Sequence, residues 1–254
     1  MPSISSHSVL IIGGSSGIGH AVAQLTLDQN ARVFISSSNA ARISNAVDSI
    51  REKFPHGSIK GFPCDLKSAK VESNLEKLLT QVVAANDGQL LDHIVFTAGD
   101  QLPIKPLTDI DHDFIHDAGQ VRFVAPLLVG KLAPRFLKQS YISSFTLTGG
   151  MIARKPSPAW SVVAGYMSGL EGMTKNLALD LKPIRVNLVL PGAVDTDLWG
   201  TLEDRKSTME MLKKVSFQER VASAAEVAES YIYLLRDTNA TGSTVTTHGG
   251  AILI

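Results

Sequence analysis

The sequence predicts an α/β fold in which a parallel sheet of about seven strands lies between two layers of helices. Two observations predict it. Short apolar runs rich in Val, Ile and Leu recur along the chain, as is typical of strands buried on both faces. Stretches with a helical spacing of apolar residues alternate with these runs, which indicates parallel βα units. With 254 residues and 44% hydrophobic content the chain can bury one large core, so we expect a single domain over residues 1–254.

The first βα unit is the most informative stretch. The apolar run 9–12 leads directly into a glycine-rich turn, and a helical pattern begins after it. Glycines let the chain bend tightly and let a pyrophosphate approach the backbone, while the first N–H groups of the helix face the phosphates. We therefore predict a dinucleotide site in a Rossmann-like, doubly wound sheet, with a purely structural turn as the alternative. The predicted pyrophosphate-binding residues are Gly13, Ser15, Ser16, Gly17, Ile18 and Gly19.

The second βα unit bears on the choice of cofactor. A strand at 32–36 and a helix at 40–53 are joined by Ser37, Ser38 and Asn39, and Arg42 follows one turn later. An NAD site usually has an acid at this junction to hold the ribose 2′-hydroxyl, whereas a 2′-phosphate needs hydroxyl or amide donors and a cation. Since no acid is present, we predict NADP(H). The alternative is that Ser37 and Asn39 only cap the helix.

The remaining elements follow in alternation. We expect further strands at 58–62, 91–97, 140–146, 184–190 and 243–247, and further helices at 68–85, within 109–138, at 160–181 and at 222–235. The apolar face of the helix at 160–181 belongs to the core or to a subunit interface. Residues 197–219 are less regular and rich in charge, and we predict that they form a substrate lid.

The composition argues against several classes of protein. A net charge of zero provides no basic surface for nucleic acid. Cys64 is the single cysteine, so we expect neither an internal disulfide nor a cysteine-based metal site, and we interpret Cys64 as a small buried residue. No apolar run approaches the roughly 18 residues of a membrane helix. We predict a cytoplasmic protein without metal, membrane or nucleic-acid partners that acts on a small molecule.

Two charged residues are candidates for the substrate side of the site. Asp100 begins the loop 100–106 after a strand, where ligands bind in open α/β sheets, although a solvated or capping acid is the alternative. Arg122 lies among apolar neighbours in a helical pattern. Its guanidinium therefore either reaches water or faces a polar cavity.

The spacing Gly-x-x-x-Gly-x-Gly resembles that of the short-chain dehydrogenase/reductase family. Three further segments match that family in order, at 97–99, 184–187 and 191–196, and the resemblance covers essentially the whole chain. It implies a homodimer or homotetramer paired through two long central helices. It also places Arg122 where standard members have an active-site Asn. The cofactor contacts that it implies are Asp65 at the adenine and Ala98, Gly99, Pro191, Gly192, Val194 and Thr196 at the nicotinamide end.

The proton-transfer residues of the family are missing from this sequence. Standard members use a Tyr followed four residues later by Lys, beside a Ser that binds the carbonyl. Here the positions four residues after the tyrosines are Phe145, Leu170, Leu235 and Asp237. Alignment puts the Tyr position at Val163, the Lys position at Met167 and the Ser position near Gly149 or Gly150. We therefore do not expect the usual alcohol dehydrogenase mechanism, because an alkoxide at neutral pH needs a positioned acid or base.

A divergent branch of the family, found in fungal indole-alkaloid pathways, also lacks these residues and keeps an Arg at the Asn position. In that branch NADPH reduces an iminium ion, and the same pocket guides an intramolecular Diels–Alder cyclisation. The sequence resembles the branch at Asp100, Arg122 and Trp160 and departs from it at 157–159, where an Asp is expected shortly before the Trp. The predicted pocket residues are Asp100, Arg122, Thr148, Ser157, Trp160 and Tyr166.

Each of these residues has an expected role. Arg122 would orient substrate or cofactor, Asp100 would balance a substrate cation, and Trp160 would stack on the substrate. Tyr166, one turn beyond Val163, would direct a hydroxyl to nearly the same place. The predicted function is NADP(H)-dependent reduction of an iminium, imine or activated carbonyl in secondary metabolism, with or without cyclisation. A redox-silent cyclase or isomerase that retains NADP⁺, and an inactive NADP(H)-binding protein, stay open as alternatives.

Overall fold

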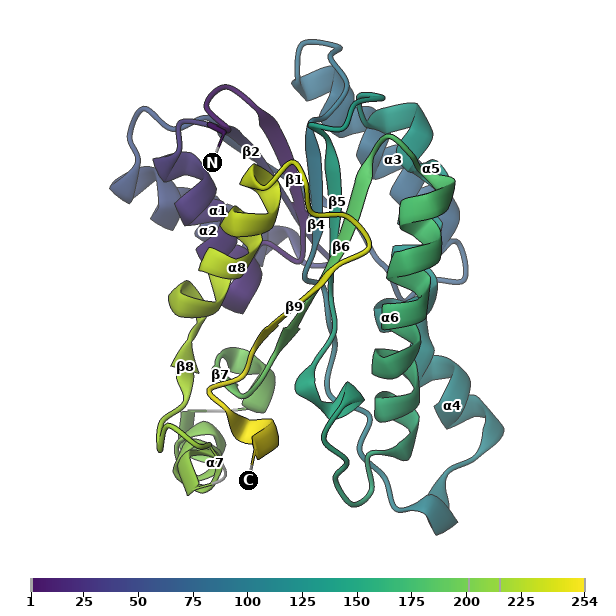
Figure 1. The fold of residues 1–254 in the computed structure, drawn as a ribbon. Helices are drawn as coiled ribbons and strands as arrows, with labels where there is room; N and C mark the ends of the chain where they lie inside the picture. Colours follow the sequence, from purple (N-terminus) through teal and green to yellow (C-terminus); the bar gives the residue numbers. More distant parts are fainter. Residues whose placement is uncertain (1, 201, 215, 254) are drawn as a thin grey trace.

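The computed structural model describes residues 2–200, 202–214 and 216–253, and it places seven of the described strands in one sheet (Figure 1). All neighbouring strands are parallel and their order is β3-β2-β1-β4-β5-β6-β9. The predicted doubly wound parallel sheet is therefore confirmed. The strands are β1 (Ser8–Ile12), β2 (Arg32–Ser37), β3 (Ile59–Pro63), β4 (His93–Phe96), β5 (Ser144–Thr148), β6 (Arg185–Pro191) and β9 (Thr244–Thr247).

The point where the chain changes direction lies between β1 and β4. The chain runs outward from β1 to β3 and then returns to the other side of β1. In open α/β sheets, ligands bind outside the carboxyl ends of the strands at such a point. Ile12 of β1 pairs with Ser36 of β2 and with Phe96 of β4. The glycine turn, the β2–α2 junction and residues 97–99 therefore meet at one edge.

Two layers of helices cover the sheet (Figure 1). Val9 and Ile11 of β1 belong to the core shared with α1, α2 and α8, whereas Leu10 and Ile12 belong to the core shared with α3, α5 and α6. This alternation follows from the pleat of a strand that is buried on both faces. The helices are α1 (Gly17–Asp28), α2 (Ala40–Lys53), α3 (Val71–Ala85), α4 (His112–Gly119), α5 (Ala125–Phe136), α6 (Ser161–Asp180) and α8 (Ala224–Arg236).

The strand expected at 140–146 lies later in the chain than predicted. It begins at Ser144 and extends to Thr148 as β5. The preceding residues form a turn instead, in which the Ser143 N–H donates to the Ser140 carbonyl at 3.1 Å. The Ser140 hydroxyl also accepts the Ile142 N–H at 3.1 Å. Serine side chains favour such local bonds to the backbone over a strand ladder.

The long helix expected within 109–138 is interrupted. A π-helical turn, η2 (Gln120–Val124), separates α4 from α5, and Pro126 stands in the first turn of α5. Proline has no N–H to donate, and π-helical turns inside helices are frequent at functional sites. The interruption contains Arg122, so it sets the direction of that side chain.

The region predicted as a lid is more regular than expected. It contains η4 (Asp197–Trp199) and helix α7 (Leu202–Lys214), which is rich in the strong helix formers Glu, Lys, Met and Leu. Positions 201 and 215 of the predicted lid lie outside the described residues. A two-stranded sheet of β7 (Val194–Asp195) and β8 (Ala222–Ser223) frames this region on either side.

Two negative findings concern the described residues alone. None of their helices combines the length and the apolar character that crossing a membrane requires. Within the same part of the chain, no group of three or more His, Cys, Asp and Glu side chains is placed to hold a metal ion.

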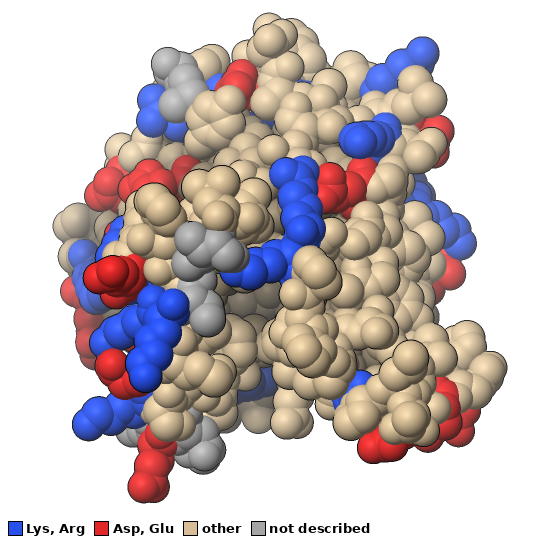
Figure 2. Space-filling view, turned by 60° about the horizontal axis from the view of Figure 1, so that its bottom comes forward, with Lys and Arg blue, Asp and Glu red and all other residues tan. Residues whose placement is uncertain are grey.

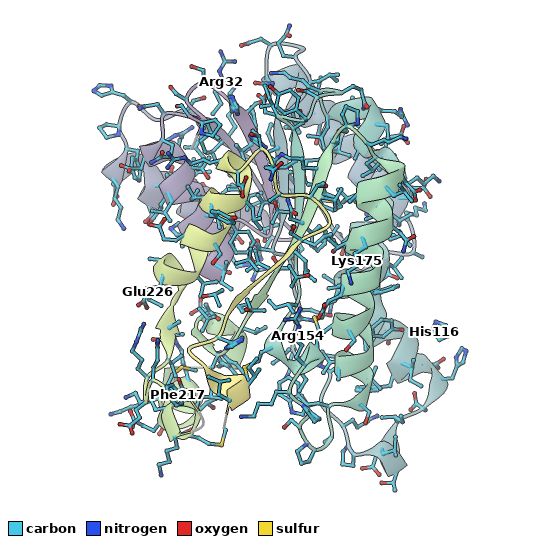
Figure 3. The ribbon with its side chains drawn as sticks, in the orientation of Figure 1. Arg32, His116, Arg154, Lys175, Phe217 and Glu226 are labelled. Carbon is cyan, nitrogen blue, oxygen red and sulfur yellow. The ribbon has the colours of Figure 1, made fainter. Side chains whose placement is uncertain are left out.

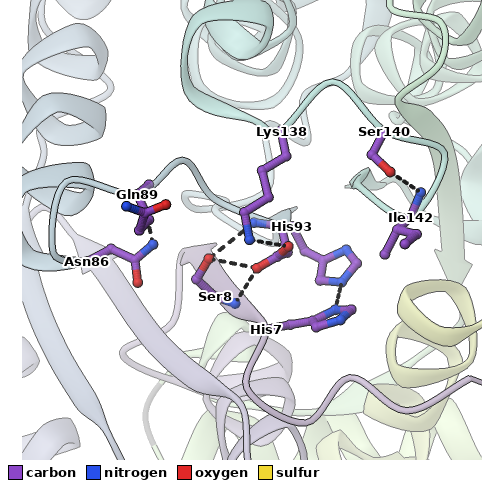
Figure 4. A network of polar contacts seen from close by, with 9 residues as sticks. His7, Ser8, Asn86, Gln89, His93, Lys138, Ser140 and Ile142 are labelled. Atoms are coloured by element: carbon purple, nitrogen blue, oxygen red, sulfur yellow. Dashed lines mark hydrogen bonds and ion pairs between the residues drawn. The ribbon is translucent and has the colours of Figure 1, made fainter.

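A buried polar cluster lies at the opposite, amino-terminal edge of the sheet (Figure 4). His93 is fully buried, with Nε2 lying 3.0 Å from Nδ1 of His7 and Nδ1 lying 2.8 Å from the Ser144 hydroxyl. Burial, together with the nearby charges of His7 and Arg185, lowers the pKa of His93 to about 3. The folded protein therefore holds this imidazole neutral.

This cluster makes the protein sensitive to acid. The unfolded chain takes up a proton on His93 near its ordinary pKa of 6.5, whereas the folded chain does so only near 3. The contribution to stability is therefore complete above about pH 6.5 and is lost as the pH falls from there towards 3, at about 1.4 kcal/mol per pH unit. Urea unfolding measured as a function of pH should show this slope in the free energy of unfolding. His93→Gln should lower the slope by about 1.4 kcal/mol per pH unit, which corresponds to one proton fewer taken up on unfolding. An unchanged slope in that variant would contradict the assignment.

Candidate active site

Glycines hold the turn between β1 and α1 against the end of β4. Gly13 has φ +99°, and a Cβ placed on it would lie 2.4 Å from the Ala98 nitrogen. A Cβ on Gly19 would lie 2.3 Å from the Gly13 carbonyl oxygen and 2.4 Å from Thr97 Oγ1. Neither position accepts a side chain unless the backbone moves. The structure thus brings the predicted pyrophosphate turn together with Ala98.

The N-terminus of α1 is open to an anion. Ser16 stands at the N-cap position without a side-chain hydrogen bond, whereas Asn39 caps α2 and Ser223 caps α8. Uncapped N–H groups at the positive end of a helix dipole bind phosphate well. Ser15 and Ile18 lie on either side of this helix start. The turn therefore fits a dinucleotide pyrophosphate.

The far end of the chain also reaches this turn. Gly17 has φ +53°, and a Cβ on it would lie 3.2 Å from Thr196 Cγ2. Gly192, after β6, donates its N–H to the Thr247 carbonyl at 2.9 Å. Trp199 Nε1 donates to the Val194 carbonyl at 2.8 Å. The segment from Pro191 to Thr196 thus lies beside the glycine turn, where the nicotinamide end is expected.

The junction after β2 presents polar groups and a cation. Arg42 NH2 donates to Ser38 Oγ at 3.3 Å, and Asn39 Oδ1 accepts the Arg42 N–H at 3.0 Å. Asn39 therefore does cap α2, as the alternative interpretation holds, while Ser37 makes no such bond. Arg42 forms no ion pair with an acid of the described residues, so its charge is available to a 2′-phosphate.

The loop after β3 contains Cys64 and Asp65. The exposed Asp65 accepts the Lys67 N–H on Oδ1 at 2.9 Å, and its carbonyl accepts from Asn74 Nδ2 at 2.9 Å. These bonds fix the loop at the carboxyl edge without covering it. Burial, with a contribution from Asp65, raises the pKa of the Cys64 thiol to about 11. Cys64 therefore stays a protonated, buried thiol, as the sequence suggested.

Arg122 and Asp100 form the polar centre of the substrate side. Arg122 NH2 donates to the Asp100 carbonyl, and Nε lies 3.3 Å from Asp100 Oδ1. Lys67 Nζ lies 3.1 Å from Asp100 Oδ2. Burial lowers the pKa of Arg122, which is only 12% exposed, while Asp100 opposes the shift. Arginine nevertheless stays charged in proteins.

The same guanidinium lies directly over Gly99. A Cβ on Gly99 would lie 2.7 Å from Arg122 NH1. Its buried Nε makes no hydrogen bond of good geometry within the described part of the chain. The structure therefore brings together Gly99, Asp100 and Arg122. Asp100 thus has two cationic partners from the protein itself, Lys67 and Arg122, and it holds Arg122 in position. That Asp100 balances a substrate cation stays a prediction.

The other predicted pocket residues are spread more widely. Trp160 precedes α6 and packs partly buried against the core, and Ser157 is exposed in the same loop. The loop is tied to the Asp100 side, because the Lys105 N–H donates to the Ala159 carbonyl at 3.1 Å. Thr148 Oγ1 lies 2.7 Å from the hydroxyl of the buried Tyr231. The Thr148 hydroxyl therefore takes part in packing between β5 and α8.

Tyr166 lies against α4. Its hydroxyl donates to the Ile115 carbonyl at 2.9 Å, and its ring packs beside Gly119 and Phe123. Val163 and Met167, where the sequence alignment expects the Tyr and Lys positions, are both buried in the core. The structure therefore does not bring Tyr166 to the Arg122–Asp100 pair. Its role as a hydroxyl donor there stays a prediction that the geometry does not favour.

Sequence reasoning missed two residues at this edge. Lys67 completes the ion pairs of Asp100 but comes from the loop after β3, so no spacing along the chain indicated it. Thr97 donates through Oγ1 to the Ile12 carbonyl at 3.3 Å and contacts Gly19, and its place in a matched segment was the one available signal.

Figure 2 shows the face at the carboxyl edge of the sheet, with Lys and Arg side chains lying across its middle. Such a face suits an anionic cofactor.

Comparisons with known proteins agree with this geometry. A family model described as an SDR-like Rossmann domain matches residues 2–254. The short-chain dehydrogenase/reductase ATR9 of Stachybotrys chlorohalonatus is 41% identical over 254 residues, with all of both chains covered. The MalC reductase/Diels-Alderase structure from Malbranchea aurantiaca has a TM-score of 0.92 at 37% identity, covering 98% of this chain and 97% of that one. A short-chain dehydrogenase from Burkholderia cenocepacia in complex with NADP has a TM-score of 0.84 at 25% identity, covering 98% and 99%.

Proposed function

The chain belongs to the short-chain dehydrogenase/reductase family, and on that premise we propose that it is an NADPH-dependent reductase of a small molecule in secondary metabolism. The observation that carries the choice of cofactor is the β2–α2 junction. It offers Ser38 and Arg42 to a phosphate and has no acid to hold a free ribose hydroxyl. Two similar proteins support the proposal, one described as a reductase/Diels-Alderase and one solved in complex with NADP.

We propose an iminium, imine or activated carbonyl carbon as the hydride acceptor. The bound cofactor supplies the hydride. The sequence has no Tyr followed four residues later by Lys, and Val163 and Met167, which the alignment puts at the positions of that pair, are buried in the core. An iminium carbon accepts hydride without protonation of its nitrogen, so orientation and proximity suffice. For a neutral imine or an activated carbonyl, the proton that balances the hydride would come from water. Arg122, fixed by Asp100 beside Gly99, would provide that orientation.

A second candidate is a cyclase that retains NADP⁺ without turning it over. MalC, to which the chain is similar, is described as both a reductase and a Diels-Alderase, and this supports a cyclase as the second candidate. Cyclisation likewise needs shape and contact more than proton transfer, so the same residues would serve it.

A direct assay separates the candidates. The protein is mixed with NADPH and a panel of cyclic iminium salts, imines and ortho-quinones, and nicotinamide absorbance and products are followed. Consumption of NADPH with a reduced product supports the reductase. Product without consumption supports the cyclase. Tight NADPH binding with neither outcome indicates an inactive binding protein and overturns the proposal.

Replacing Arg42 by Ala should change the cofactor preference. The variant loses the Arg42 guanidinium, which pairs with no acid of the described residues, and one charge-assisted hydrogen bond contributes roughly 1.5–3 kcal/mol. Affinity for NADPH should therefore fall by about tenfold or more, while affinity for NADH stays within about twofold. Calorimetric titration of both cofactors measures this. An equal loss for the two would remove the argument for a 2′-phosphate site.

We also propose a homodimer or homotetramer paired through α5 and α6. An apolar groove on these helices and on the preceding turn η2 is lined by Phe123, Leu127, Met173 and Leu177, and Leu127 is 44% exposed. Light scattering should show a dimer or tetramer for the wild type and a smaller species for Leu127→Glu. Leu107→Glu, at a 69% exposed position outside the groove, is the matched control and should leave the mass unchanged. A monomeric wild type would refute the proposal.

A further inference from the structure

We propose that Lys155 fastens the C-terminal turn across the carboxyl edge of the sheet, so that this turn forms a wall of the substrate site. The turn is η5 (Ala251–Leu253), which follows β9. That the turn lines a substrate site rests on the proposed function. The contacts that hold the turn are seen in the structure whatever the function is.

The loop after β5 is held from two opposite sides. It contains η3 (Met151–Ala153) and then two consecutive cations, Arg154 and Lys155. Arg154 makes a two-pronged ion pair with Glu171 of α6, with Nε–Oε1 and NH2–Oε2 distances of 3.0 Å. Lys155 Nζ instead donates to the Ala251 carbonyl of the C-terminal turn at 2.5 Å. Adjacent side chains thus join α6 and the C-terminus through one short loop.

The C-terminal turn is shaped to reach this loop. Gly249 and Gly250 have φ of +57° and +72°, a conformation that side chains with a Cβ rarely adopt. They reverse the chain after His248, whose backbone packs against Gly192 so closely that a Cβ there would lie 2.7 Å from His248 Cα. Ala251 is consequently buried, with 5% of its surface exposed. The turn lies next to the segment that the nicotinamide end is expected to contact.

The lid contacts the other side of the same turn. A Cβ on Gly250 would lie 2.9 Å from Phe217 Cβ, and one on Gly249 would lie 3.2 Å from Ser216 Oγ. Figure 3 shows Phe217 and Arg154 on either side of the C-terminal segment. A continuous bridge therefore runs from α6 through the loop and the turn to residues 216–218. Closing an edge in this way orders the substrate and excludes water from it.

Lys155 is a positioning residue in this arrangement, and Lys155→Met removes the ammonium while keeping the aliphatic stem. We expect about tenfold or more faster amide hydrogen exchange in residues 248–253 and 216–218, measured by mass spectrometry, because a charge-assisted bond is lost. Lys155→Arg should restore most of the protection. Lys60→Met is the matched control, since Lys60 Nζ also donates to a backbone carbonyl, that of Ala85, at 3.0 Å but far from the site.

Kinetics with the best iminium or quinone probe then tests the link to the site. KM for the probe should rise by about tenfold in Lys155→Met, while the dissociation constant of NADPH stays within about twofold. Unchanged exchange in the turn, or exchange that rises equally in Lys60→Met, would show that Lys155 does not hold the turn, even if the enzyme reduces the probe. Faster exchange with an unchanged KM would show that the turn is not a wall of the substrate site. If the wild type reduces no probe, the exchange result still decides whether Lys155 holds the turn, and the reductase proposal fails by itself.

Discussion

The variant Gly19→Ala should lose NADPH binding. The added Cβ would lie 2.3 Å from the Gly13 carbonyl oxygen and 2.4 Å from Thr97 Oγ1, both of which are fixed by the sheet. Relief of such a clash costs about 1–3 kcal/mol and moves the turn whose backbone would contact the pyrophosphate. We expect the dissociation constant of NADPH to rise by about 100-fold in a fluorescence titration.

Two measurements distinguish a local effect on NADPH binding from unfolding of the variant. The far-ultraviolet circular dichroism spectrum of the variant should match that of the wild type. Gly172→Ala makes the same chemical change inside α6, where nothing lies within 4 Å of the new Cβ. That control should bind NADPH normally and gain about 0.5–1 kcal/mol of stability from the better helix former. Unaltered NADPH affinity in a folded Gly19→Ala protein would count against the whole cofactor site.

The second large effect is expected for Arg122→Met. This variant keeps an unbranched apolar stem but removes the guanidinium that lies over Gly99 and binds Asp100. If Arg122 orients the reacting partners, kcat with an iminium probe should fall by about 100-fold, as it does on loss of one positioned donor. NADPH affinity should change by less than about fivefold, because the pyrophosphate and 2′-phosphate contacts stay intact.

A conservative variant and a surface control sharpen the interpretation. Arg122→Lys keeps a charge but loses the planar fork that directs two separate nitrogens at the carbonyl and the carboxylate of Asp100, so it should have intermediate activity. Arg135→Met removes an exposed ion pair with Glu76 on the same layer of helices and should be neutral in activity. Full activity in Arg122→Met would show that the guanidinium has a structural role and does not orient the reacting partners.

The fold followed from local signals that add up along the chain. The apolar run 9–12, the glycine turn and the alternation of patterns predicted the sheet, because strands buried on both faces leave few other arrangements. The π-helical turn at Gln120–Val124 was not predictable, since its apolar residues fit a continuous helix equally well. The helix α7 was missed because its exposed charges hide the strong helix propensity of the same residues.

The cofactor end of the site was easier to predict than the substrate end. Each residue predicted for the cofactor lies at the carboxyl end of a strand or within a few residues after it, so sequence order alone brings it to the edge. The substrate side depends on side-chain directions, and these are set by tertiary contacts. Tyr166 was expected to face the pocket but bonds to Ile115, while Lys67 completes the Asp100 ion pairs from a loop that showed no motif.

The most direct test of the reductase is transfer of an isotope. The protein is incubated with an iminium probe and NADPH that carries deuterium at the transferable position of the nicotinamide ring, with each face labelled in turn. We predict that one of the two labelled forms gives a product that contains deuterium at the former iminium carbon. A product free of deuterium with both forms, or no product while the bound cofactor stays reduced, would contradict it.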